Sequence, residues 1–151
     1  MKTIFIILSF LFFTSCDNNN NSDFQSTEIT FTEIGKGNLS GNGAENISQS
    51  NLVINNQTEW QNLIGQMNSV NNVSDTFSET TIDFDSYTVI AIFDIIRAHT
   101  GFSIQIDSII KTDKNITVNY TEQSMSDGFT IIIQPFHIIK ILKTNKDIIF
   151  E

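Results

Sequence analysis

The stretch YTVIAIFDI, residues 87–95, decides the fold class, because it is apolar at nearly every position. A strand with one face in solvent alternates apolar and polar side chains, whereas a strand covered on both faces is apolar throughout. We therefore expect residues 87–95 to form a central strand with other layers packed on both of its sides.

Around this strand lie further segments with the length and alternation of short strands, separated by turn signals. In FSIQIDSI (102–109), Phe102, Ile104 and Ile106 alternate with polar side chains, and TDKN (112–115) is typical of a hairpin turn in which Asn115 can take a positive φ. The other expected strands are 28–34, 51–54, 116–123, 129–134, 136–143 and 147–150. The glycine-rich and asparagine-rich GKGNLSGNGAEN (35–46) is expected to be a loop.

One segment, NNQTEWQNLIGQM (55–67), predicts a helix over residues 57–68. Asn56 can cap it, and Glu59 three residues later completes a capping-box pattern. The apolar side chains fall at i, i+3, i+4 and i+7 and form one stripe, which we interpret as core packing rather than an aromatic ligand box: Trp60, Leu63, Ile64 and Met67.

Together these elements predict one mainly β domain of the α+β class. It should be an antiparallel sheet or sandwich with one amphipathic helix near the start of the domain. A length of 151 residues leaves room for a single domain.

The N-terminus has the features of an export signal. Lys2 precedes an apolar run, and the stretch FFTSC resembles a bacterial lipobox that ends at Cys16, the single cysteine. We expect a signal peptide at 1–15, lipidation of Cys16, a flexible tether at 16–27 and one domain at 28–151. The chain would then be an exported lipoprotein of the cell envelope, anchored at the outer membrane or cell surface; an ordinary signal peptide with a spare cysteine is the alternative.

Charge and composition bear on the class of function. The net charge of −9 disfavours nucleic-acid binding, which needs clustered cations. With His99 and His137 as its two histidines, the chain has few ligands for zinc, and we expect no metal site and no cofactor. Asp83 and Asp85 should share one exposed strand face, with only a weak resemblance to a calcium loop. No nucleophile-elbow or dinucleotide-binding pattern is present, so we expect no enzyme, although a serine–histidine–aspartate triad could still assemble from distant positions.

The stretch QPFHIIKILK (134–143) holds the only proline, Pro135. Proline cannot donate to a strand ladder, so Gln134–Pro135 should mark a corner between two strands. His137 shares a face with Ile139 and Ile141, and we interpret it as a strand histidine, partly buried and hydrogen-bonded to backbone.

Several segments, taken in order, resemble the PrcB C-terminal domain family, from about residue 53 to the end. They are VINNQTEWQNLI, IDFDSYTVIAIF, RAHTGFSIQIDSI, NITVNYTEQS and QPFHIIKI. The resemblance implies a non-catalytic lipoprotein subunit that supports a surface protease complex, so a protease is the expected kind of partner. This sequence departs from the family at the turn, with Thr100 for a glycine and Phe102 for tyrosine, and at the corner, with Gln134 for serine and Phe136 for tyrosine.

A looser similarity is to chagasin-like cysteine-protease inhibitors, which is the alternative function. Thr100, Gly101 and Phe102 match part of one inhibitory loop, and Gln134-Pro135-Phe136 partly resembles another. For either function we predict partner contacts at two places. These are the turn with Arg97, His99, Thr100, Gly101 and Phe102, and the corner with Pro135, Phe136 and His137.

Two of these side chains have a competing interpretation. Phe102 and Phe136 could begin their strands and point into the core, because Phe102 is in phase with Ile104 and Phe136 with Ile138. For Arg97 and His99 we expect no role in folding, because a polar turn needs neither of them.

Overall fold

A computed structural model describes residues 25–126 and 128–151. The predicted signal peptide, the lipidation site Cys16 and most of the tether lie outside these residues. Within the described part of the chain, no helix is long and apolar enough to cross a membrane.

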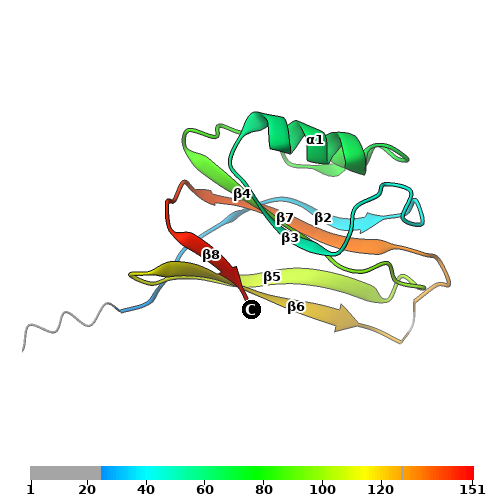
Figure 1. Ribbon diagram of the computed structural model, residues 1–151. Helices are drawn as coiled ribbons and strands as arrows, with labels where there is room; N and C mark the ends of the chain where they lie inside the picture. The colour runs from blue at the N-terminus through cyan, green and yellow to red at the C-terminus, as the bar shows by residue number, and fades with distance from the viewer. Residues whose placement is uncertain (1–24, 127) are drawn as a thin grey trace, which may run out of the picture.

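The described residues form two four-stranded sheets, one helix and a short 3-10 turn (Figure 1). The first sheet has the order β1-β5-β6-β8 and the second has the order β2-β7-β4-β3. Neighbouring strands are antiparallel except β6 and β8, which are parallel. The elements are β1 (Thr27–Glu28), β2 (Thr32–Leu39), β3 (Ser50–Ile54), α1 (Gln57–Met67), η1 (Val73–Thr76), β4 (Tyr87–Phe93), β5 (Phe102–Lys111), β6 (Asn115–Ser124), β7 (Gln134–Leu142) and β8 (Asp147–Phe150).

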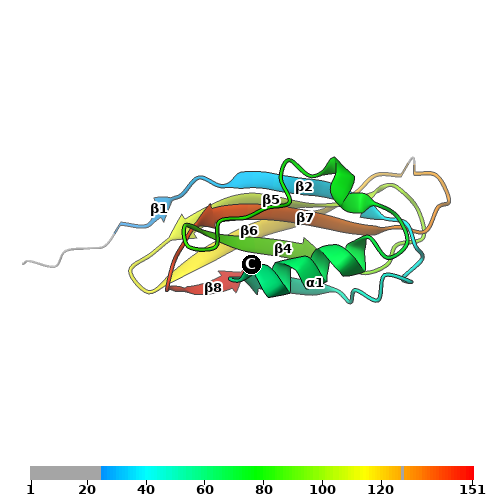
Figure 2. The ribbon, with the colours of Figure 1, turned by 90° about the horizontal axis from the view of Figure 1, so that it is seen from above.

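The layers are α1, then the β2-β7-β4-β3 sheet, then the β1-β5-β6-β8 sheet (Figures 1 and 2). β4 lies between β7 and β3 in the middle layer. Its Val89, Ala91 and Phe93 join the core beneath α1, while Ile90 and Ile92 join the core between the sheets. The prediction of a mainly β, α+β sandwich with a doubly covered central strand is confirmed.

Helix α1 forms as its capping pattern indicates. The Asn56 side chain accepts a hydrogen bond from the Glu59 N–H at 2.9 Å, and the Glu59 carboxylate accepts one from the Asn55 N–H at 3.4 Å. The whole apolar stripe is buried, and Trp60 is 0% exposed with its indole N–H donated to the Thr80 carbonyl at 2.9 Å. The interpretation of the stripe as core packing is confirmed.

The predicted strand 28–34 is wrong in its bounds. The chain pairs briefly with β5 as β1 and then enters the other sheet as β2, while Ile29 and Phe31 between them pack against the inter-sheet core. β2 also continues through the predicted loop as far as Leu39. A Cβ on Gly35 would lie 2.4 Å from the Phe77 ring, so this glycine lets the ring pack on the strand.

Two further details differ from the sequence predictions. Among the described residues only Asn42 and Asn46 have positive φ without being glycine, so Asn115 closes its hairpin in an ordinary conformation, with the Thr112 hydroxyl accepting from the Asn115 N–H at 3.0 Å. Residues 129–133 are not a regular strand and contribute only the bridge between Ile133 and Arg97. Pro135 therefore sits one residue inside β7 and not between two full strands.

Candidate functional site

Two connections meet at one end of the sandwich, and we call them the apical loops. They are residues 94–101, between β4 and β5, and residues 125–126 and 128–133, between β6 and β7. Arg97 N–H donates to the Ile133 carbonyl at 2.7 Å, and Thr100 N–H donates to the Phe129 carbonyl at 3.0 Å. β1, where the described chain begins, lies at the opposite end (Figure 1). The structure thus brings the predicted turn residues together on a loop cluster far from the N-terminal end.

Arg97 holds a buried carboxylate. Its Nε and Nη2 lie 2.6 and 2.8 Å from the Asp94 oxygens, and Asp94 is fully buried. Asp94 also accepts the Ile95 N–H at 2.6 Å, and Arg97 reaches Glu122 at 2.6 Å. The pKa of Arg97 is raised, first by the hydrogen bond to Asp94, so the guanidinium stays charged. This cation compensates a buried anion, which gives a physical reason to expect that folding does need Arg97.

Phe102 lies beneath Arg97 and beside His99. The Arg97 guanidinium carbon is 4.5 Å from the centre of the Phe102 ring, and the His99 and Phe102 ring centres are also 4.5 Å apart. Phe102 is half-buried and belongs to neither core cluster, so it points neither fully inward nor freely outward. The geometry is that of a cation–π contact. The turn is therefore a preformed cluster with little freedom to rearrange.

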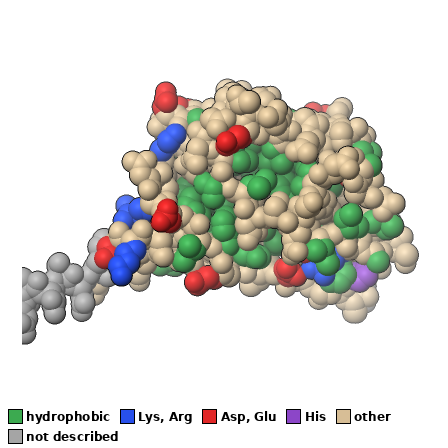
Figure 3. All heavy atoms as spheres, in the orientation of Figure 1, with side chains coloured by type: hydrophobic (Ala, Val, Ile, Leu, Met, Phe, Trp, Pro, Cys, Tyr) green, Lys and Arg blue, Asp and Glu red, His purple; other side chains and the backbone are tan. Residues whose placement is uncertain are grey.

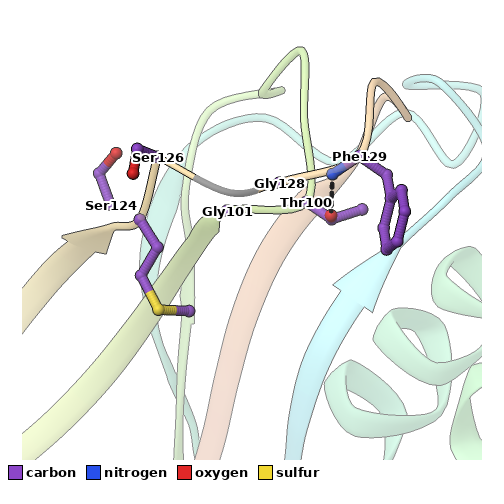
Figure 4. Close-up of a pocket in the computed structure, with 7 residues that line it drawn as sticks. Thr100, Gly101, Ser124, Ser126, Gly128 and Phe129 are labelled. Atoms are coloured by element: carbon purple, nitrogen blue, oxygen red, sulfur yellow. Dashed lines mark hydrogen bonds between the residues drawn. The ribbon is translucent and has the colours of Figure 1, made fainter.

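The two apical loops touch through glycines. A Cβ on Gly128 would lie 2.3 Å from the Gly101 nitrogen, and one on Gly101 would lie 2.2 Å from the Met125 carbonyl oxygen. Figure 4 shows the two backbones side by side, with the dashed bond from the Phe129 N–H to the Thr100 hydroxyl. Thr100, Gly101 and Gly128 also line a pocket of about 460 Å³, together with two serines and the apolar side chains of Met125 and Phe129.

The predicted corner residues lie elsewhere. Pro135 is buried in β7, Phe136 is 1% exposed beneath α1, and His137 is 0% exposed between the sheets. A partner cannot reach these residues in this structure, so a surface contact at the corner is not supported. The competing interpretation of Phe136 as a core residue is confirmed.

His137 joins the two sheets. Its Nδ1 accepts the Ile106 N–H at 2.8 Å, and its Nε2 lies 3.0 Å from the Glu33 carboxylate. Because Nδ1 accepts, the proton of the neutral ring is on Nε2 and is donated to Glu33. Burial lowers the pKa of His137, and the Glu33 charge opposes this effect only in part. The prediction of a strand histidine bonded to backbone is confirmed, but the side chain is fully buried and not partly buried as expected.

Exposed apolar side chains concentrate in the apical loops, a feature that the sequence predictions missed. Of nine large hydrophobic residues that are exposed in the described chain, six belong to these loops: Ile95, Ile96, Met125, Phe129, Ile131 and Ile132. Phe129 is 77% and Met125 is 69% exposed. Figure 3 shows hydrophobic side chains at the surface at this end, as well as in the middle of the face. The lack of alternation in FTIII was the one available signal, because a strand with a single buried face would alternate.

The acidic pair before β4 has a structural role. The carboxylate of Asp83 accepts the Asp85 N–H at 3.0 Å in the turn that leads into β4, so the two side chains do not share a strand face. The pKa of Asp83 is lowered, first by a hydrogen bond from the Ser86 side chain. Within the described ranges, no group of three or more histidine, cysteine or carboxylate side chains is placed to hold a metal ion.

Comparison of the chain with protein-family models, with curated proteins and with solved structures found no match.

Proposed function

We propose that the chain is a non-catalytic accessory subunit of the cell envelope that binds a protein partner through its apical loops. The observation that carries this proposal is the concentration of exposed apolar side chains on those loops. Contiguous exposed apolar surface on a folded domain is typical of an interaction site. Aromatic residues and methionine, here Phe129 and Met125, are enriched in such interfaces.

The arrangement of the chain supports an envelope role. Lipidation of Cys16 would leave residues 16–27 as a spacer, which spans at most roughly 40 Å when fully extended. The spacer enters the fold at β1, at the end opposite the apical loops (Figure 1). The apolar loops would then face away from the point of attachment, where a protein partner can reach them.

The resemblance to the PrcB C-terminal domain supports a surface protease as the partner. In that family the lipoprotein assists a protease and does not itself cleave peptides. The chagasin-like alternative receives less support, because Pro135 and Phe136, which would have to enter a protease cleft, are buried in β7.

The proposal is tested by purifying the full-length lipoprotein in detergent from its own cells at native expression. We expect a stoichiometric protein partner, which Phe129→Asp releases and Leu142→Asp retains. Leu142 is the matched control, because it is 70% exposed but lies at the β1 end of β7. Cys16→Ala should release the chain from the membrane fraction. A chain that purifies alone, or equal retention of the partner by the two aspartate variants, would contradict the proposal.

A further inference from the structure

Residues 129–133 lead into β7 and have a neighbour on one side only. They bend at Thr130, where the Ile131 N–H donates to the Phe129 carbonyl at 2.8 Å and closes a three-residue turn. Arg97 and Ile133 exchange two backbone hydrogen bonds, at 2.7 and 3.0 Å, and Phe129 accepts from Thr100. These contacts follow the same antiparallel direction as the β4–β7 pairing, which ends where the Asp94 N–H donates to the Pro135 carbonyl at 2.9 Å. The segment is therefore an edge of the sheet at this end, with a bend at Thr130.

The other side of the segment is open. β2 is the second neighbour of β7, but its last pair joins Leu39 to Gln134, and the chain then turns away. Among the described residues, no hydrogen bond involves the backbone N–H or C=O of Thr130 or Ile132. Each backbone polar group needs a partner or water, so this edge can accept another strand.

The open edge lacks the features that protect the neighbouring edge strand. β2 carries a bulge between Glu33 and Gly35 and an exposed lysine, Lys36, which both discourage strand addition. Residues 128–136 contain no charged side chain. Ile131 is 52% and Ile132 is 41% exposed, which gives the edge apolar side chains on both of its faces.

We propose that the protein partner adds an extended apolar strand along Thr130–Ile132, in the place where β2 would continue. This inference rests on the proposed function and specifies how the partner is bound. Main-chain hydrogen bonds to Thr130 and Ile132 hold the added strand, and its alternate side chains pack on Phe129, Ile131 and Ile132.

Charge and position select this occupant over two others. At a net charge of −9, a second copy of the chain and an anionic lipid surface are both repelled, whereas a strand flanked by lysine or arginine is attracted. The loops also lie opposite β1, away from the expected membrane anchor. The partner is therefore a protein that presents an uncharged extended segment with basic flanks.

The test places a photo-crosslinking benzoylphenylalanine at Ile131 of the full-length chain in its own cells, with Leu142 as the control position. We expect one crosslinked protein at position 131, mapped by mass spectrometry to an extended apolar segment, and none at position 142. Adding Ile132→Pro removes the outward N–H and should lower the crosslinking yield at position 131 about tenfold, as expected for the loss of one interfacial hydrogen bond. Ile132→Val keeps the N–H and should stay within about twofold.

Several results would overturn the inference. One is a crosslink to a second copy, to a lipid or to a helical segment. Another is an equal crosslinking yield with Ile132→Pro and Ile132→Val, while both variants keep the wild-type denaturation midpoint. If the partner copurifies but position 131 gives no crosslink, the accessory function stands and strand addition is wrong. If neither a partner nor a crosslink is found, both proposals fail.

Discussion

Replacing Arg97 with alanine should destabilise the domain strongly, although Arg97 lies in a connecting loop. Asp94 is fully buried and keeps one hydrogen bond, from the Ile95 N–H, once the guanidinium is removed. Breaking a buried ion pair from one side costs about 3–5 kcal/mol, and the 18% exposure of the Arg97 side chain places this case near the lower limit. We therefore expect a loss of about 3 kcal/mol, or about 12 °C in melting temperature at about 4 °C per kcal/mol.

The measurement is urea unfolding followed by the fluorescence of Trp60, the only tryptophan. Asp94→Asn and the double variant complete a cycle, in which the double variant should lose much less than the sum of the single losses. Glu122→Gln is the control, because Glu122 is 44% exposed and should contribute less than about 1 kcal/mol. If Arg97→Ala lost less than about 0.5 kcal/mol, the ion pair would be dispensable and the reasoning would be refuted.

Three further predictions concern the core and the loops. Trp60→Ala should cost about 3–5 kcal/mol in urea unfolding, followed here by far-UV circular dichroism because the variant has no tryptophan, and an unchanged midpoint would mean that the ring is not core. Gly128→Ala should separate the apical loops, because its Cβ would meet the Gly101 nitrogen at 2.3 Å. The amide hydrogen-exchange rate of Thr100 should then rise, while the exchange rates in β4 stay slow. An unchanged exchange rate at Thr100 would disprove the contact. The buried neutral His137 makes the unfolded state bind more protons than the folded state below about pH 6.5. The stability that this group contributes is thus complete above that pH and falls as the pH is lowered towards the folded pKa. His137→Gln should flatten the slope of the unfolding free energy against pH between pH 7 and 5. Equal slopes for the wild type and the variant would contradict the assignment.

The elements predicted correctly are those whose structure follows from their own residues. β4 is apolar on both faces, and α1 carries a cap and a stripe, so local pattern and tertiary packing agree. β2 was misjudged because Gly35 and Gly37 look like loop residues, while the role of Gly35 depends on the ring of Phe77, which is distant in the sequence. Residues 129–133 have strand composition but only one neighbouring segment, which no local pattern reveals.

The candidate site was predicted in part for the same reason. The sequence pointed to Arg97 and His99 as the unusual members of a turn, and the structure places both beside Phe102. It could not show that Arg97 is tied to Asp94, because a buried aspartate at the end of a strand looks like a turn residue. The exposed apolar side chains were missed because exposure depends on which neighbours are absent.

The pairing of β2 with β7 has a consequence for the order of folding. In the middle layer β2 and β4 both pair with β7, which is made after every strand except β8, whereas β3 pairs with β4 alone. Until β7 docks, β4 has a neighbour on one edge only, and the Glu33 carboxylate has no imidazole to bind. Such distant pairing slows folding relative to local pairing, because the intervening loop must close first. A nascent chain would therefore expose one edge of its most apolar strand from the synthesis of Phe93 until that of Leu142, and this interval is where a chaperone would act.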